Sequence, residues 1–278
     1  MTRTRAVLAA TGLADGAVLL AAQAPGATAR EINIRAAEAG NEGDHRGAPA
    51  EGDRPLDVRT PPAEAASDRA SLGRWVAAQL ADVRPDVVLV DAFPGGILGE
   101  LCELAALRGP VLRHTARLLR WPAYARRLDG ALPRFDAVMA VEPLHAGHER
   151  ALRPHAGVLE PLALPVPDYP RIAPPPGAPW LVVHTGPPRE VRTLARLADE
   201  RRGDAPLRVV CPVAVEDLPA GAERVHAVPA RPLYAEAAHI VTGAGFNTVH
   251  ELAPLRDRHT VVPFDRRLDD QHARARRL

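Results

Sequence analysis

The 278-residue sequence contains no lysine, so all 35 of its basic residues are arginines. Without lysine the protein has no Schiff-base nucleophile, no pyridoxal-phosphate anchor and no P-loop lysine. The only serines are Ser67 and Ser71, and neither lies in the G-x-S-x-G elbow of the common serine hydrolases. Cys102 and Cys211 are the only cysteines, too few for a thiolate zinc site or a disulfide-stapled scaffold.

The sequence also lacks an excess of one charge and a long apolar run. The net charge is +1, which predicts no nucleic-acid partner. No apolar run approaches the roughly 20 residues that span a bilayer. With so few cysteines, we expect a reduced, cytoplasmic protein. The arginines along 266–277 indicate a solvated helix face, or a peripheral membrane contact through anionic lipid or phosphate.

Short apolar runs alternate with amphipathic stretches along the chain. The stretch 63–83 places Leu72, Val76 and Leu80 on one helical stripe, and 97–107 repeats that spacing. The apolar runs, several of them rich in β-branched residues, predict buried strands at 16–22, 86–91, 111–112, 137–141, 180–183, 208–211, 239–241 and 260–262. Strands that alternate with helices predict parallel βαβ units and an α/β fold.

A proline-rich segment divides the chain into two such halves. Residues 161–179 contain prolines too densely for a helix or a central strand, and we expect a linker there. The predicted domains are therefore 1–160 and 180–278. Because paired α/β domains usually bind a ligand between them, the expected architecture is two Rossmann-like domains facing across a cleft.

The strongest chemical signal is the sequence IVTGAGFNTVHE at 240–251. A buried strand runs into a Gly-Ala-Gly turn, and we expect a helix to begin at about Asn247. Unpaired N–H groups and the helix dipole at such a start attract an anion, and Gly243 and Gly245 allow close approach to the backbone. Glu251 lies on the same helix face and could accept hydrogen bonds from both ribose hydroxyls of a nucleotide. VVPF follows at 261–264 and DDQ at 269–271.

These three parts, in this order, resemble the C-terminal domain of MurG-like GT-B glycosyltransferases. That group carries G-x-G-x-[NT]-[ST]-x-x-E, then a hydrophobic strand ending in proline, then an acidic-Gln pair. The resemblance implies that Glu251 binds the ribose of a nucleotide-sugar donor and that Asp270 and Gln271 contact its sugar. It implies a diphosphate site at Gly243, Ala244, Gly245, Asn247 and Thr248.

Two further segments carry the resemblance. VVHTGPPRE at 182–190 is similar to the first strand and phosphate-side loop of that domain, which places Thr185 and Gly186 near the donor. Two prolines there replace small glycine-rich residues. VVLVDAFPGGILGEL at 87–101 resembles a segment of predicted, uncharacterised members of the group. Because the sequence begins in what resembles the helix after the family's first strand, at 4–13, we expect the N-terminal domain to lack that strand.

The implied reaction is glycosyl transfer to an acceptor hydroxyl on a small or lipid-linked molecule, with inversion, no cofactor and no metal. No D-x-D motif of the metal-dependent transferases occurs. Asp91, at the end of a predicted strand, is a candidate general base, although N-capping of the next helix is the simpler interpretation.

Other interpretations stay open. A degenerate domain that binds a nucleotide sugar or a partner protein without turnover is one, and a sugar-nucleotide epimerase is another. His145, His148 and Glu149 allow a metal hypothesis, but their spacing is more typical of a solvated helix end. His184, beside the predicted donor site, is expected to be hydrogen-bonded only.

Overall fold

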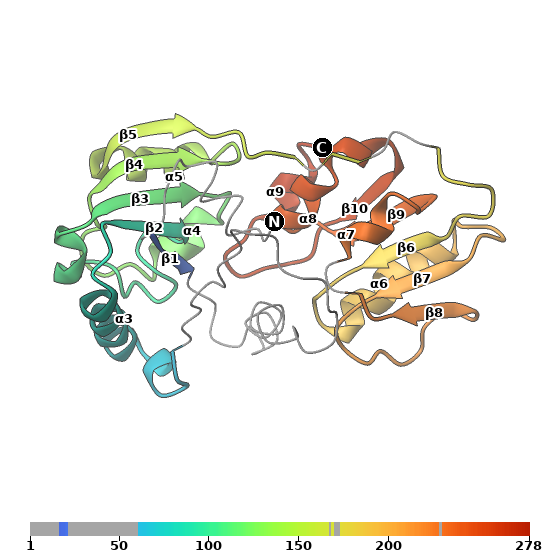
Figure 1. Ribbon diagram of the computed structural model, residues 1–278, viewed down its shortest axis with the longest axis horizontal. Coiled ribbons are helices and arrows are strands. Elements are labelled where there is room, and N and C mark those ends of the chain that lie inside the picture. The colour runs from blue at the N-terminus through green and yellow to red at the C-terminus, as the bar shows by residue number, and fades with distance from the viewer. Residues whose placement is uncertain (1–16, 22–60, 167, 170–172, 228–229) are drawn as a thin grey trace, which may run out of the picture. The chain divides into compact units, whose positions relative to one another are not determined.

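The computed structural model describes residues 17–21, 61–166, 168–169, 173–227 and 230–278. They form two compact units, each built on a five-stranded sheet whose neighbouring strands are all parallel (Figure 1). Of the described residues, the first unit contains those up to Pro165 and the segment Arg267–Asp270. The second contains Val166–Arg266 and Gln271–Leu278.

The first unit has strand order β1-β2-β3-β4-β5, so each new strand is added at the same edge. Its α3 begins after Asp68, whose side chain accepts the Ser71 N–H, and buries the predicted stripe of Leu72, Val76 and Leu80. Its elements are β1 (Ala17–Ala21), η1 (Ala65–Ser67), α3 (Arg69–Val83), β2 (Val87–Ala92), η2 (Ala105–Arg108), β3 (Val111–Ala116), α4 (Trp121–Ala125), β4 (Phe135–Ala140), α5 (Ala146–Leu152), η3 (Arg153–His155) and β5 (Ala156–Pro161).

The second unit has strand order β10-β9-β6-β7-β8. Its elements are β6 (Trp180–Val183), α6 (Pro188–Asp199), β7 (Leu207–Val210), β8 (Ala222–Val225), α7 (Arg231–Tyr234), β9 (His239–Gly243), α8 (Phe246–Glu251), η4 (Ala253–Arg258), β10 (His259–Val262) and α9 (Gln271–Ala275).

Successive residues of the central strands in the second unit enter two different cores. Val182 of β6 and Val241 of β9 pack with α6, whereas Leu181 and Ile240 pack with Tyr234 on the other face. This alternation follows from the two-residue period of a strand, and burial on both faces explains why these strands read as continuous apolar runs. The α/β fold with two Rossmann-like parallel sheets is therefore confirmed.

Every apolar run that predicts a strand overlaps an observed strand, but the helix predicted at 97–107 is wrong. Gly96, Gly99 and Glu103 have φ angles of 81°, 85° and 58°, which an α-helix does not accommodate. Bends and turns fill 97–103 instead, with η2 after them, and the buried Glu100 carboxylate accepts the N–H groups of Ile97 and Leu98. The helix expected at 4–13 lies outside the described residues.

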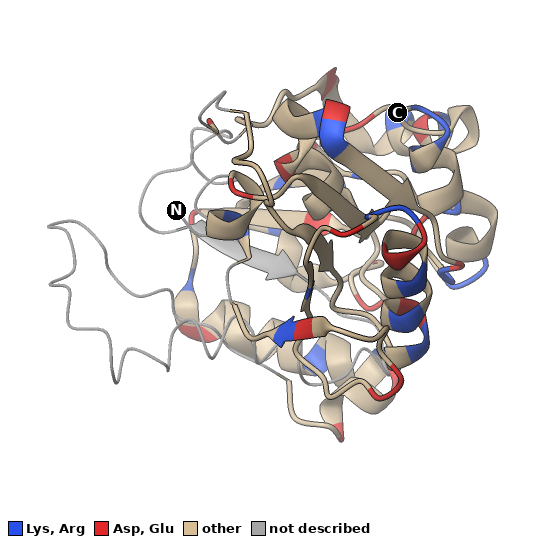
Figure 2. Ribbon diagram, turned by 90° about the vertical axis from the view of Figure 1, so that its right-hand side faces the viewer, with Lys and Arg blue, Asp and Glu red and all other residues tan. Residues whose placement is uncertain are grey.

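Charge and hydropathy of the described residues agree with the composition. Arginine and acidic residues are interspersed along the ribbon (Figure 2). Among the helices that the structure describes, none combines the length and the apolar character needed to cross a membrane.

Candidate functional site

The second sheet brings two of the predicted donor-binding segments to one edge. From β6 the chain adds β7 and β8 on one side, then returns to add β9 and β10 on the other. The neighbouring strands β6 and β9 therefore connect onward to opposite sides of the sheet, β6 to β7 and β9 to β10. Open α/β sheets bind ligands at the carboxyl ends of two strands that diverge in this way, which is called the switch point. Val183 pairs with Thr242, so both strands end at the same level. Thr185 and Gly186 follow β6, and residues 244–248 follow β9.

The turn after β9 is open at its second glycine. Gly245 is the N-cap residue of α8, and a Cβ built on it meets no atom within 4 Å. Asn247 and Thr248 lie in the first turn of α8, where N–H groups have no acceptor inside the helix. The Asn247 Oδ1 atom is buried and has no hydrogen-bond partner among the described residues. The first-turn N–H groups are the donors that an anion site requires, whereas Oδ1 is an acceptor and suits a donor group of a ligand.

The backbone of Ala244, between the two glycines, is hydrogen-bonded to other residues of the protein. It is fully buried, its N–H donates to the Val262 carbonyl at 3.1 Å, and its carbonyl accepts from Arg274 Nη1 at 2.9 Å. The expectation that all the turn amides are unpaired is therefore wrong for Ala244. Arg274 is only 4% exposed and lies over the Phe246 ring, which also corrects the prediction of a solvated arginine face at this residue.

Gly243 and Gly186 both pack against His184. A Cβ on Gly243 would lie 2.8 Å from His184 Cε1, and one on Gly186 would lie 2.6 Å from Glu190 Oε2. His184 Nε2 is 2.7 Å from Glu190 Oε2, and Arg266 binds both oxygens of that carboxylate. The expectation that His184 is hydrogen-bonded is confirmed.

The ionisation states in this network follow from burial and pairing. Burial alone would raise the pKa of Glu190, but hydrogen bonds from Arg266 and His184 outweigh it and lower that pKa. Burial lowers the pKa of His184 despite its carboxylate partner. A neutral His184 that donates to an ionised Glu190 satisfies both groups. The network braces the loop after β6 against the end of β9.

The other predicted donor-binding residues are divided between the units. Glu251 is the last residue of α8, half-buried, and close enough to the Tyr169 and Tyr234 hydroxyls to add to the burial that raises their pKa values. Gln271 is buried at the start of α9, and its Oε1 accepts the Phe264 N–H at 3.0 Å. Asp270 is grouped with the first unit and Gln271 with the second, although the two residues are consecutive in the chain.

Asp91 is the second-to-last residue of β2, and both of its carboxylate oxygens have partners. Thr115 Oγ1 donates to Oδ1 at 2.8 Å, and Arg117 forms an ion pair with Oδ2. No helix begins directly after β2, so the N-capping interpretation is wrong. A carboxylate held by a guanidinium is a poor general base, because the cation favours the ionised form.

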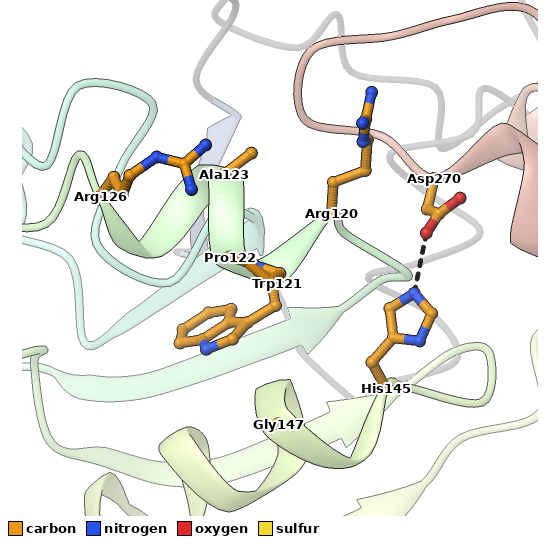
Figure 3. Close-up of a pocket in the computed structure, with 8 residues that line it drawn as sticks. All are labelled: Arg120, Trp121, Pro122, Ala123, Arg126, His145, Gly147 and Asp270. Carbon is orange, nitrogen blue, oxygen red and sulfur yellow. Dashed lines mark hydrogen bonds and ion pairs between the residues drawn. The ribbon is translucent and has the colours of Figure 1, made fainter.

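A pocket of about 520 Å³ lies in the first unit (Figure 3). His145 Nε2 is 2.9 Å from Asp270 Oδ2 at its side, although sequence reasoning gave neither residue this role. The sequence gives no sign of this pair, because 125 residues separate His145 from Asp270 and local spacing carries no information over that distance. The pocket is lined by Arg120, Trp121, Pro122, Ala123, Arg126, His145, Gly147 and Asp270.

His148 lies behind this pocket and not in solvent. Its ring is fully buried and stacks on Trp121 at 4.4 Å and 11°, so the prediction of a solvated helix end is wrong for this residue. Within the described part of the chain, no three His, Cys, Asp or Glu side chains are grouped so that they could hold a metal ion.

Comparison with known proteins finds distant structural similarity and no match in sequence. No family model and no curated protein matches the sequence. Among solved structures, the chain is similar to the glycosyltransferase SnogD from Streptomyces nogalater, with 17% identity and a TM-score of 0.40. The match covers 74% of this chain and 63% of SnogD, less than two thirds of its length. Because one fold hosts many unrelated activities, this similarity assigns none here.

Proposed function

We propose that this protein is a glycosyltransferase that moves a sugar from a nucleotide-diphosphate donor to an acceptor hydroxyl, with inversion and without a metal. The observation that carries the proposal is the switch point of the second sheet. The two segments whose sequences resemble the MurG-like donor site, 182–190 and 240–251, end adjacent strands β6 and β9 there. The topology of the sheet thus supports a ligand site at the same carboxyl ends of β6 and β9 that the sequence resemblance implies.

The proposed donor contacts follow from the chemical groups at the carboxyl ends of β6 and β9. The first-turn amides at Asn247 and Thr248, with the open backbone of Gly245, suit a doubly charged diphosphate. Thr185 and Gly186 approach from the loop after β6. Glu251 accepts hydrogen bonds from the ribose hydroxyls, which a carboxylate without its own protons does well. Gln271 is a sugar-side contact through its amide nitrogen, since its oxygen binds Phe264.

The reaction is a single displacement. The acceptor oxygen loses its proton to a base and forms a bond to the anomeric carbon. The bond from that carbon to the diphosphate oxygen breaks, and the diphosphate leaves with the electron pair. Helix-start amides stabilise the negative charge that grows on the leaving group.

Glu251→Ala tests the donor site directly. Calorimetric titration with UDP, GDP and TDP sugars should show binding of at least one by the unaltered protein, weakened more than tenfold by the substitution. Glu200→Ala is the matched control, because Glu200 is an exposed carboxylate at the far end of α6. If the unaltered protein binds none of these donors, the donor site is misassigned.

Product analysis separates the proposal from its alternatives. Acceptor-dependent release of nucleoside diphosphate indicates a transferase. Binding without release indicates a binding protein, and an altered sugar still attached to its nucleotide indicates an epimerase.

A further inference from the structure

The imidazole ring of His184 fills the space between two glycines of the proposed donor site. A Cβ built on Gly186 would lie 2.3 Å from His184 Nε2, and one built on Gly243 would lie 2.8 Å from Cε1 and 3.0 Å from Nδ1. The two ring nitrogens therefore face different segments, Nε2 the loop after β6 and Nδ1 the turn after β9. A group that binds to both segments lies next to this ring.

Segments that follow three structural elements hold the ring in place. His184 comes directly after β6, and its own N–H donates to the Val210 carbonyl at 3.1 Å. Phe264 comes after β10, and the centroid of its ring is 5.2 Å from that of the imidazole. Glu190, in the first turn of α6, contacts Nε2 at 2.7 Å. The His184 side chain is only 9% exposed, so packing fixes the position of the ring.

The charges around the imidazole cancel while the ring is neutral. The Glu190 carboxylate faces the ring from α6, and Arg266, in the loop after β10, binds both oxygens of that carboxylate. Among the described residues, these two are the charged groups that act on His184. Burial lowers the pKa of His184, so the ring is neutral in the free protein at pH 7. A proton added to the ring would leave this group of three side chains with one positive charge.

The second nitrogen of the ring is available to a ligand. Nδ1 has no hydrogen-bond partner among the described residues. Because Nε2–H donates to the carboxylate, Nδ1 carries the lone pair of the neutral ring. A lone pair repels a phosphate oxygen, whereas a protonated Nδ1 donates a charge-assisted hydrogen bond to it. A diphosphate beside Gly243 is therefore bound better when His184 is protonated.

We propose that His184 contacts the diphosphate of the donor and that donor binding draws a proton from solvent onto His184 Nδ1, which then donates to a phosphate oxygen. This inference rests on the proposed function and adds a binding residue that the sequence resemblance does not imply. Glu190 is a positioning residue, because its carboxylate holds Nε2–H and stabilises the imidazolium. Arg266 keeps that carboxylate ionised and offsets its repulsion of the diphosphate.

Calorimetric titration with UDP-glucose, GDP-mannose and TDP-glucose measures this proton. The diphosphate of a nucleotide sugar has no group that titrates near neutral pH, so a proton taken up on binding goes to the protein. Titrations at pH 6.5 in two buffers of different ionisation enthalpy should give uptake of about half a proton or more per bound donor. The donor Kd should be about tenfold lower at pH 6 than at pH 8, because the complex binds more protons than the free protein.

Substitutions of His184 separate the proton from the packing. His184→Gln keeps an amide donor for Glu190 in place of Nε2–H but has no counterpart of Nδ1. At pH 6 it should bind the donor about tenfold or more weakly, with no proton uptake. His184→Asn places an amide donor where Nδ1 lies, so it should bind more tightly than His184→Gln, also without proton uptake. His226→Asn removes an exposed histidine of the same unit and is the control.

Glu190→Gln tests the positioning role. It keeps an acceptor for Nε2–H but removes the charge that stabilises the imidazolium, so proton uptake at pH 6.5 should fall by about half or more. Uptake equal to that of the unaltered protein would contradict the role of the carboxylate.

The outcomes distinguish this inference from the proposed function. Failure of the unaltered protein to bind any of the three donors contradicts the proposed function, and this inference with it. Donor binding with the same Kd at pH 6 and pH 8, or proton uptake that persists in His184→Gln, overturns the present inference alone. The pH dependence of the unaltered protein needs no variant, so a loss of folding in His184→Gln leaves that test intact.

Discussion

Gly243 and Gly245 lie two residues apart in one turn but serve different purposes. The space beside Gly243 is filled by the His184 ring, whereas the space beside Gly245 is empty. Gly243 is thus required by packing inside the second unit. Gly245 keeps the start of α8 accessible, which is the property a diphosphate needs.

This difference predicts opposite effects of the same substitution. Gly243→Ala should lower the free energy of unfolding by about 1 to 3 kcal/mol, because the new methyl group overlaps a buried ring. Gly245→Ala should leave it nearly unchanged, since φ there is −67° and suits alanine, but should weaken donor binding. Urea denaturation and calorimetry check both. Equal destabilisation by the two substitutions would contradict this assignment.

At the scale of elements, the segment 93–104 shows how local conformation overrides a helical pattern. Leu101, Leu104 and Leu107 have helical spacing, yet left-handed residues at 96, 99 and 103 force turns. The buried Glu100 carboxylate then supplies the acceptors that a helix would have supplied. A periodic pattern predicts burial correctly here and secondary structure wrongly.

We expect Glu100→Ala to destabilise the protein by about 2 to 4 kcal/mol, because two N–H groups in a buried segment lose their acceptor. Glu100→Gln retains one acceptor oxygen and should cost less. Glu64→Ala removes an exposed carboxylate and is the control. Urea midpoints followed by tryptophan fluorescence give the order, and a Glu100→Ala protein as stable as the control would refute the role of the carboxylate.

The strands that sequence reasoning missed are β5 and β8, each at the edge of its sheet. Exposed residues predominate in β5 and occupy the centre of β8. An edge strand can bury fewer side chains than a central one, and these two carry no continuous apolar run for periodicity to detect, unlike the edge strands β1 and β10.

At the scale of the molecule, both units bury histidines in the neutral form. Burial lowers the pKa of His114 and His259 to about 4 and that of His148 to about 3, from an ordinary 6.5. The unfolded chain therefore binds protons below pH 6.5 that the folded protein does not. The stability that the three neutral histidines contribute is therefore fully present above pH 6.5, and it is lost as the pH falls toward their pKa values in the folded protein.

Acid should consequently destabilise the protein well before its carboxylates titrate. His148→Phe, which preserves an aromatic ring against Trp121, should reduce the stability lost between pH 6.5 and 4.5 by about 2 to 3 kcal/mol. His155→Phe controls for loss of a histidine at a partly exposed position. Urea denaturation at both pH values checks this, and an unchanged pH dependence for His148→Phe would show that His148 is not a buried neutral group.

The sequence by itself determined the parallel α/β class and the central strands, because burial on both faces leaves continuous apolar runs. It also determined that 182–190 and 240–251 end strands, since glycine and proline stop the runs there. Only the tertiary structure decided that β6 and β9 are neighbours, that His184 fills the space at Gly243, and that Asp270 pairs with His145. These depend on strand order and on contacts between residues far apart in the chain, for which local periodicity carries no information.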